Sequence, residues 1–192
     1  MKRLLLFSII GFSIVIYFIL TVLLLPVHYL SNEQLVPQPY FEVILSDSEI
    51  SLGESFRLDV VSENIGDYGD IHIVSTAFPD LIELDSVEIV TYDFTQSPVY
   101  IQLGDEIISG YSGGLESTLS EYPSIEAMNR PIHPGTKYHF ELVITPEKPG
   151  SFTTYVKSID IPHINSLSHY PDSGVLDHQN EYVSVYSVNV NP

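Results

Sequence analysis

The chain has 192 residues, with 25 acidic side chains against seven Lys and Arg, and a formal net charge of −18. Such an acidic surface excludes nucleic acid and anionic lipid headgroups as partners. The absence of cysteine excludes disulfides, type 1 copper sites and iron–sulfur clusters, since all of these need the thiol group.

Residues 4–25 are uncharged and mostly apolar, and a helix of that length would span the ~30 Å core of a bilayer. Lys2 and Arg3 precede the run, and the next basic residue is Arg57, so the positive-inside rule places the N-terminus in the cytoplasm. No Ala-x-Ala cleavage pattern follows the run. We therefore predict an uncleaved signal anchor over residues 1–26. The expected location is the cell membrane, single pass, with the C-terminal domain outside, on an archaeal or bacterial surface.

Residues 27–39 form the predicted juxtamembrane spacer, which ends in two prolines that favour an extended connector. From residue 40 onward apolar residues recur with a period of two, which is typical of strands. The clearest runs are 41–45, 56–61, 71–73, 138–144, 152–156 and 182–190, with shorter candidates at 87–92 and 98–103. Gly- and Pro-containing turns separate them. We predict one extracytoplasmic domain over 40–192, an antiparallel Ig-like β-sandwich of about seven to nine strands. The only helix expected in it is a turn or two within residues 115–128.

Two long connections interrupt this pattern, at residues 109–134 and 161–181. Connections of this length are usually functional or disordered, so both are candidates for the working surface. The last strand also carries apolar residues on both faces, with Tyr186 and Val188 opposite Val183 and Val185. One face fits the core, and the other needs a cover from the inserted segments, the anchor region or a partner.

Residues 53–66, GESFRLDVVSENIG, together with PGT at 134–136 and PGSFTTYVK at 149–157, resemble the immunoglobulin-like extracellular modules of the CARDB/NEW3 type. That resemblance covers residues 40–160 and implies a non-catalytic spacer, adhesion or assembly unit. The long segment 109–134 departs from the compact pattern of such modules.

The 161–181 loop carries His163, His169 and His178, with three Asp residues nearby. Imidazole and carboxylate groups are ligands for Zn²⁺ and Cu²⁺, although these histidine spacings match no tight ligand signature. We expect no cofactor, and the alternative is a Cu or Zn site on the three histidines. Residues 110–114 match the G-x-S-x-G pattern around Ser112, but they lack the strand–turn–helix context that makes such a serine a nucleophile.

An N-terminal anchor followed by a cysteine-free sandwich is also similar to the outer domain of the B subunit of copper membrane monooxygenases. The His-x-His copper pair of that family corresponds to Thr153 and Tyr155 here, so the copper site is not carried over. The resemblance implies a metal-free relative or an accessory subunit.

These observations predict a non-enzymatic, membrane-embedded scaffold or assembly protein. Its expected partner is another membrane or cell-surface protein, and no nucleic acid. The alternative is an accessory subunit of a multi-subunit membrane enzyme complex that binds metal through the 161–181 loop.

Overall fold

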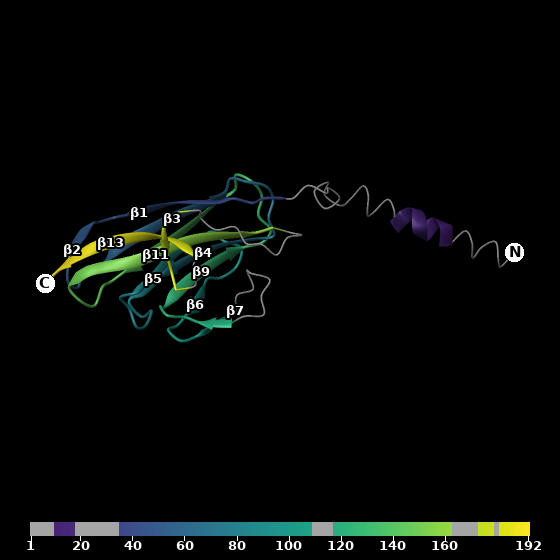
Figure 1. The fold of residues 1–192 in the computed structure, drawn as a ribbon. Coiled ribbons are helices and arrows are strands. Elements are labelled where there is room, and N and C mark those ends of the chain that lie inside the picture. Colours follow the sequence, from purple (N-terminus) through teal and green to yellow (C-terminus); the bar gives the residue numbers. More distant parts are fainter. Residues whose placement is uncertain (1–9, 18–34, 109–116, 163–172, 179–180) are drawn as a thin grey trace. The chain divides into compact units, whose positions relative to one another are not determined.

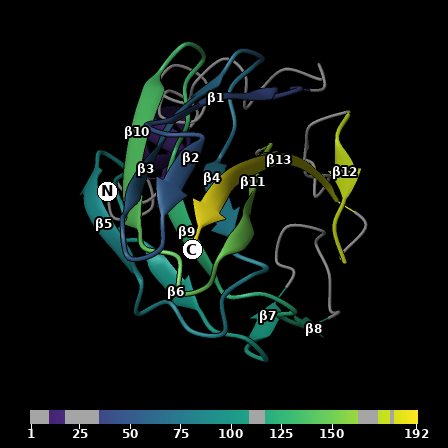
Figure 2. The same ribbon diagram turned by 90° about the vertical axis from the view of Figure 1, so that its left-hand side faces the viewer.

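The computed structural model describes residues 10–17, 35–108, 117–162, 173–178 and 181–192. The chain divides into two compact units, Met1–Leu35 and Val36–Pro192. In the first unit, residues 10–17 form a helix. In the second unit, two β-sheets form the layers of a sandwich (Figures 1 and 2).

The predicted single-pass membrane location is wrong for the part of the chain that the structure describes. No helix there is long and apolar enough to cross a bilayer. The signal anchor and the transmembrane helix before the sandwich are thus unsupported, and most of the span predicted for them lies outside the described residues. The domain boundaries at 26 and 39 stay predictions.

The smaller sheet has four strands in the order β1-β3-β10-β5. They are β1 (Pro39–Leu45), β3 (Phe56–Asn64), β10 (Lys137–Ile144) and β5 (Val87–Tyr92). The larger sheet has seven strands, six of them in the order β12-β13-β11-β4-β9-β6, with β2 paired to β13. They are β12 (Val175–Leu176), β13 (Tyr182–Asn191), β11 (Gly150–Ile161), β4 (Ile71–Ala77), β9 (Ser124–Asn129), β6 (Val99–Ile101) and β2 (Glu49–Ser51). A separate hairpin joins β7 (Glu106–Ile108) to β8 (Ser117–Leu119).

The core lies between the two sheets and follows from the alternation that the sequence shows. In β3, Phe56, Leu58 and Val60 point inward and are buried, while Arg57 and Asp59 point outward. β10 repeats the pattern, with Phe140 and the other alternate apolar residues buried. Burying each such side chain contributes about 1.5–3 kcal/mol. The facing strands β4, β9, β11 and β13 supply the opposite half of the core.

The predicted all-β class is confirmed, and all eight predicted runs coincide with or overlap strands, namely β1, β3, β4, β5, β6, β10, β11 and β13. The helical turn expected within residues 115–128 is wrong, because that stretch contains β8 and the start of β9. β9 lies inside the larger sheet, and its outward-facing Glu126 and Met128 are both partly buried. The strand therefore shows none of the clean alternation by which a half-exposed strand is recognised.

A buried polar network joins the two sheets across the core. His72 of β4 has one ring nitrogen, Nδ1, hydrogen-bonded to Asp160 of β11 and the other, Nε2, 2.8 Å from Ser62 Oγ of β3. The Ser62 hydroxyl also lies 3.1 Å from Ser158 Oγ and 3.1 Å from the carbonyl oxygen of Tyr40 on β1. All four network side chains, those of Ser62, His72, Ser158 and Asp160, are buried.

Aromatic rings seal this network from solvent. The ring of Phe94 stacks on His72 with centroids 6.2 Å apart, and that of Tyr138 lies at 5.5 Å. The connectivity Ser62–His72–Asp160 is that of a hydrolytic triad, but a serine with no access to substrate does no chemistry. Buried polar groups that hydrogen-bond one another in a low-dielectric interior instead favour one arrangement of the strands that carry them. We therefore assign this network a structural role.

The chain offers a matched test of this assignment, because His139 and Asp59 form a second His–Asp pair at 2.5 Å on the outer face of the smaller sheet. Their side chains are 36% and 35% exposed, against 0% for both members of the buried pair. We expect Asp160→Asn to lower the free energy of unfolding by about 2 kcal/mol, since it removes a buried charged acceptor. Asp59→Asn should cost less than about 1 kcal/mol. Urea unfolding measures both, and equal losses would contradict the structural assignment.

Candidate functional site

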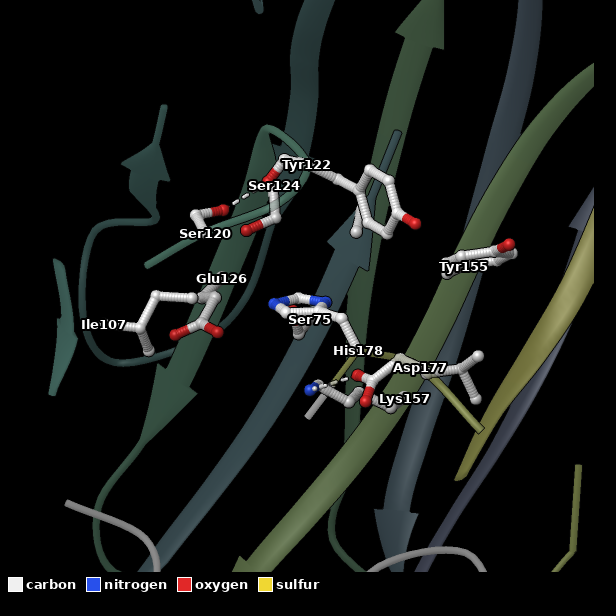
Figure 3. Close-up of a pocket in the computed structure, with 12 residues that line it drawn as sticks. Ser75, Ile107, Ser120, Tyr122, Ser124, Glu126, Tyr155, Lys157, Asp177 and His178 are labelled. Atoms are coloured by element: carbon white, nitrogen blue, oxygen red, sulfur yellow. Dashed lines mark hydrogen bonds and ion pairs between the residues drawn. The ribbon is translucent and has the colours of Figure 1, made fainter. Parts of the chain in front are cut away.

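The outer face of the larger sheet carries a pocket between two of the connecting segments of the domain. β12 and the β7–β8 hairpin lie on the side of this sheet that faces away from β3 and β10 (Figure 2). Between them the structure leaves a small cavity of about 30 Å³, room for roughly two water molecules (Figure 3). The pocket is lined by Ser75, Ala77, Ile107, Ser120, Tyr122, Ser124, Glu126, Tyr155, Lys157, Asp177, His178 and Val183.

Strand register builds the floor of the pocket from adjacent rows of side chains. Ser75 of β4 pairs with Lys157 of β11 on one side and with Glu126 of β9 on the other. One step along, Ala77 pairs with Tyr155 and Ser124 in the same way. The central strand therefore carries two small residues between longer side chains, which leaves a hollow above β4.

Lys157 holds the segment that closes one side of this hollow. Its ammonium group donates a hydrogen bond of 3.1 Å to Asp177 Oδ2 and a second one to Glu181 Oε2. Burial lowers the pKa of Lys157, but the carboxylates of Glu181 and Asp177 more than offset this, so the pKa lies above its ordinary value. Lys157 is thus a charged residue, held beneath the segment by two carboxylates.

Backbone contacts fix the same segment further. Asp177 Oδ1 accepts a 3.0 Å hydrogen bond from the backbone N–H of Glu181, and the backbone N–H of Asp177 donates to the Glu181 carbonyl oxygen at 2.9 Å. Gly174 passes so close to β13 that a Cβ atom there would lie 2.5 Å from the Val183 carbonyl oxygen, and its φ is +143°. Only glycine fits both conditions. Residues 174–178 therefore run against Val183, which is buried, whereas Val185, the other apolar residue on that face of β13, stays 41% exposed.

The imidazole of His178 is the unusual group of the pocket. Both of its ring nitrogens are buried, and neither has a hydrogen-bond partner among the described residues. The ring packs edge-on against Tyr122 with centroids 5.6 Å apart, and Tyr122 in turn contacts Tyr155 at 5.9 Å. Burial, followed by the charge of Glu121, raises the pKa of Tyr122, so its phenol stays neutral. A buried polar atom without a partner costs about 1–3 kcal/mol, so these nitrogens favour a bound water or ligand group.

The charge of the pocket is negative. Among the residues that line the pocket, Lys157 carries one formal positive charge, and Asp177 and Glu126 carry two formal negative ones, which leaves −1. Among the described residues, no serine of the pocket hydrogen-bonds to His178, so they provide no nucleophile–base pair. Across the described ranges, no three His, Asp or Glu side chains converge as metal ligands would.

The predicted metal-site residues are therefore only partly placed. His178 lies in the pocket, while His163, His169 and Ser112 lie outside the described residues. Both long connections do contribute to the pocket, through Ser120–Glu126 on one side and Asp177–His178 on the other. The sequence analysis did not identify Lys157 or Glu126 as pocket residues. The strand that contains Lys157 is otherwise rich in apolar and hydroxyl residues, and a lysine in such a strand could have indicated a buried ion pair.

A second feature lies beside the pocket, where both sheets end. β5 and β6 are the terminal strands of their sheets, and no described strand pairs with their outer edges. Between them runs a groove of about 500 Å³ lined by residues 89–92, Ser97, Pro98 and Tyr100. Val90, Tyr92, Val99 and Tyr100 are exposed there. Because Val99 pairs with Glu126, the row Lys157–Ser75–Glu126 of the pocket floor continues to this open edge.

Comparisons with known proteins give likenesses in fold only. No family model and no curated protein sequence matches the chain. Among solved structures, a CARDB domain from Pyrococcus furiosus, described in complex with di-metal ions, is 13% identical, with a TM-score of 0.40 over 84% of this chain and 95% of that one. A cohesin module from a Clostridium perfringens glycoside hydrolase is 11% identical, with a TM-score of 0.40 over 82% and 98%. A β-glucosidase from Listeria innocua is 15% identical, with a TM-score of 0.37 over 81% of this chain and 16% of that one.

The first two of these are Ig-like modules, as the predicted CARDB/NEW3 resemblance implies for the fold. At these sequence identities and TM-scores, the likenesses support no conclusion about the family, activity or partner of this protein. The predicted resemblance to copper monooxygenase subunits has no support among them.

The Lys157 cluster generates a prediction about alkaline stability. A lysine whose pKa is higher in the folded state adds stability that is complete below about pH 10.5 and is lost as the pH rises through the folded-state pKa. Urea unfolding between pH 9 and 11.5 should therefore show a decline that is shallower in Lys157→Met. Below pH 10 this variant should be less stable by about 3 kcal/mol, because it leaves two buried carboxylates unpaired.

Lys137→Met is the matched control, since Lys137 is 67% exposed and lies 3.9 Å from Glu63. It should follow the pH dependence of the wild type, tyrosine titration included. Parallel declines for all three proteins would show that Lys157 does not pin the segment.

Proposed function

We propose that this protein is a non-catalytic binding module that takes up an extended, basic segment of a partner protein at the open edge of β6. The observation that carries the proposal is this edge itself, which no described strand pairs with and which carries exposed apolar side chains in a stretch of chain rich in exposed acids. Extended segments commonly bind by adding a strand to such an edge, with main-chain hydrogen bonds for affinity and side-chain sites for specificity.

The geometry of β6 offers two different surfaces to an added strand. Val99 lies on the outer face of the sheet beside Glu126, whereas Tyr100 pairs with the inward-facing Ile125 and lines the groove toward β5. Side chains alternate between faces along a strand. An added segment would therefore place every second residue in the apolar groove and the residues between them on the acidic outer face.

The charge around the edge favours a basic segment. Residues 58–129 contain no Lys or Arg. Within residues 81–106, all the acids are exposed, namely Glu83, Asp85, Glu88, Asp93, Asp105 and Glu106. Exposed edges of one charge repel a second copy of the same chain, which is a known device against edge-to-edge aggregation. The same charge attracts a Lys- or Arg-rich segment and raises its association rate.

A peptide in which lysine alternates with valine is the direct probe. Its addition to ¹⁵N-labelled protein in 0.15 M salt should shift the amide resonances of β6 and of the groove, and binding should weaken as salt rises. A peptide in which glutamate replaces lysine should bind at least tenfold more weakly, about 1.4 kcal/mol, because every contact with the acids becomes repulsive.

Two exposed apolar residues provide a pair of variants. Val99 on β6 is 55% exposed, and Ile44 on β1, the terminal strand of the smaller sheet opposite β5, is 62% exposed. Val99→Lys should weaken binding of the lysine peptide at least about tenfold, whereas Ile44→Lys should leave it within about twofold, since a Debye length near 8 Å screens distant charges. Equal effects of the two variants, or shifts that map to β1 or β12, would exclude β6 as the binding edge.

A further inference from the structure

We infer that the main chain of Tyr100 fixes the register of the segment that binds at β6, and that this segment runs antiparallel to β6 and carries the motif basic–apolar–basic. The apolar residue of the motif, called here the anchor residue, lies opposite Tyr100. This inference rests on the proposed function and deepens it, because it names the sequence that the edge selects. It follows from the direction of the hydrogen bonds in β9 and β6.

The hydrogen bonds of β9 show which of its residues face β6. Alternate residues of an antiparallel strand direct their N–H and C=O groups to the same neighbour. The carbonyl of Pro123, directly before β9, accepts a 2.9 Å hydrogen bond from the N–H of Phe78, directly after β4. The carbonyl of Met128 accepts one of 3.3 Å from the N–H of Gln96, on the opposite side. Odd-numbered residues of β9 therefore face β4, and even-numbered residues face β6.

This register turns the main chain of Tyr100 to the open edge. Val99 and Ile101 pair with even-numbered residues of β9, so their main-chain groups point to β9. Tyr100 lies between them and pairs with Ile125, whose main chain faces β4 instead. The N–H and C=O of Tyr100 therefore point away from β9, toward the side on which no described strand pairs with β6.

The residues on either side of Tyr100 offer no second donor to an added strand. Pro98 has no N–H. The N–H of Gln102 donates a 2.8 Å hydrogen bond to Asp105 Oδ2, and its carbonyl accepts one of 3.1 Å from the N–H of Asp105. Within residues 98–102, all of which the structure describes, Tyr100 alone presents both groups at the edge. A segment therefore has one register in which a single residue exchanges two hydrogen bonds with β6.

The antiparallel direction follows from the rest of the sheet and from the bonding pattern. β6, β9, β4 and β11 all pair antiparallel to their neighbours along this path. Antiparallel pairing is also slightly more stable per residue, and in it one residue of each strand exchanges both hydrogen bonds with its partner. The anchor residue thus donates its N–H to the carbonyl of Tyr100 and accepts from the N–H of Tyr100.

The facing strand β5 supplies side chains and not a second edge for the segment. Consecutive residues of β10 pair with Ile89 and Thr91, so Val90 between them is the extra residue of a β-bulge. Bulges twist an edge and interrupt its row of main-chain groups, which protects it from added strands. Val90 is exposed and lines the groove. The segment is therefore directed to β6, with Val90 on the opposite wall.

The same register assigns the side chains of the motif. The anchor residue, like Tyr100, places its side chain on the inner face, in the groove of about 500 Å³ that Tyr92 and Val90 also line. An apolar side chain suits these exposed apolar neighbours. The residues before and after the anchor lie on the outer face. Basic side chains suit these two positions, because the exposed acids of residues 81–106 attract positive charge.

Hydrogen exchange tests the orientation of Tyr100 in the full-length protein. The amide of Tyr100 should exchange at least about tenfold faster than those of Val99 and Ile101, because only the latter are bonded to β9. The probe is a nine-residue peptide, SKSKVKSKS, whose central valine is its one apolar residue. At saturation it should slow the exchange of Tyr100 at least about tenfold. Slow exchange of Tyr100 without peptide would overturn the inference.

Methylation of the peptide main chain tests the register. A methyl group on the valine nitrogen removes the donor to the Tyr100 carbonyl, so binding in 0.15 M salt should weaken at least about tenfold, or 1.4 kcal/mol. The matched control carries the methyl group on the main-chain nitrogen of the lysine after the valine. That N–H faces away from β6 in an antiparallel pair, so binding should stay within about twofold. Both peptides keep every charge, and the amide shifts of β6 report their binding.

The outcomes separate this inference from the proposed function. If both methylated peptides bind β6 as tightly as the parent peptide, the Tyr100 register is overturned and the binding function stands. If methylation at the lysine weakens binding and methylation at the valine does not, the segment runs parallel to β6 and the antiparallel motif is overturned. If the parent peptide leaves the amide resonances of β6 unshifted, the inference and the proposed function are both overturned.

Discussion

The pairing of β4 with β11 is the constraint on which both polar features of the molecule depend. Seven consecutive residue pairs join the two strands, from Tyr155–Ala77 to Ile161–Ile71. On the inner face this register sets His72 beside Asp160, and on the outer face it sets Ser75 beside Lys157. Because side chains alternate, a shift of β11 by one residue would turn Asp160 out of the core and Lys157 into it. The interior network therefore fixes the register that the outer pocket requires.

The two long connections make an ordinary sandwich face into a site. Small residues, Ser75 and Ala77, lie at the centre of the outer face of the larger sheet. The hairpin from one side and residues 174–178 from the other partly enclose it, and burial changes the energetics of the groups beneath. An ion pair at an exposed position contributes little, whereas the same ions shielded from water hold the segment firmly once both are present. This is why Lys157 and Lys137, both paired with acids, have such different roles.

The sequence predicted the fold class well because the strands around the core expose one face and bury the other. β3 and β10 show this alternation over their full lengths. It failed for residues 117–129 because β9 has both faces covered, and it did not single out His72, which lies between two isoleucines in β4. Buried histidines become recognisable only when their partners are known, and Ser62 and Asp160 are ten and 88 residues away in the chain. For the site, the sequence indicated both long connections that border the pocket and one pocket residue, His178. The spacing of residues along the chain does not show which strands pair, so it could not place Lys157 and Glu126 beside the same hollow.

The small side chain of Ser75 allows a prediction about other sequences with this fold. Its side chain sits at the bottom of the hollow, flanked in register by Lys157 and Glu126. A leucine or phenylalanine at this position would fill the hollow from below and leave the backbone hydrogen bonds of the sheet in place, since strands tolerate both residue types. The residue at this position therefore determines whether a protein with this fold has an open hollow or a filled surface on the outer face of the larger sheet.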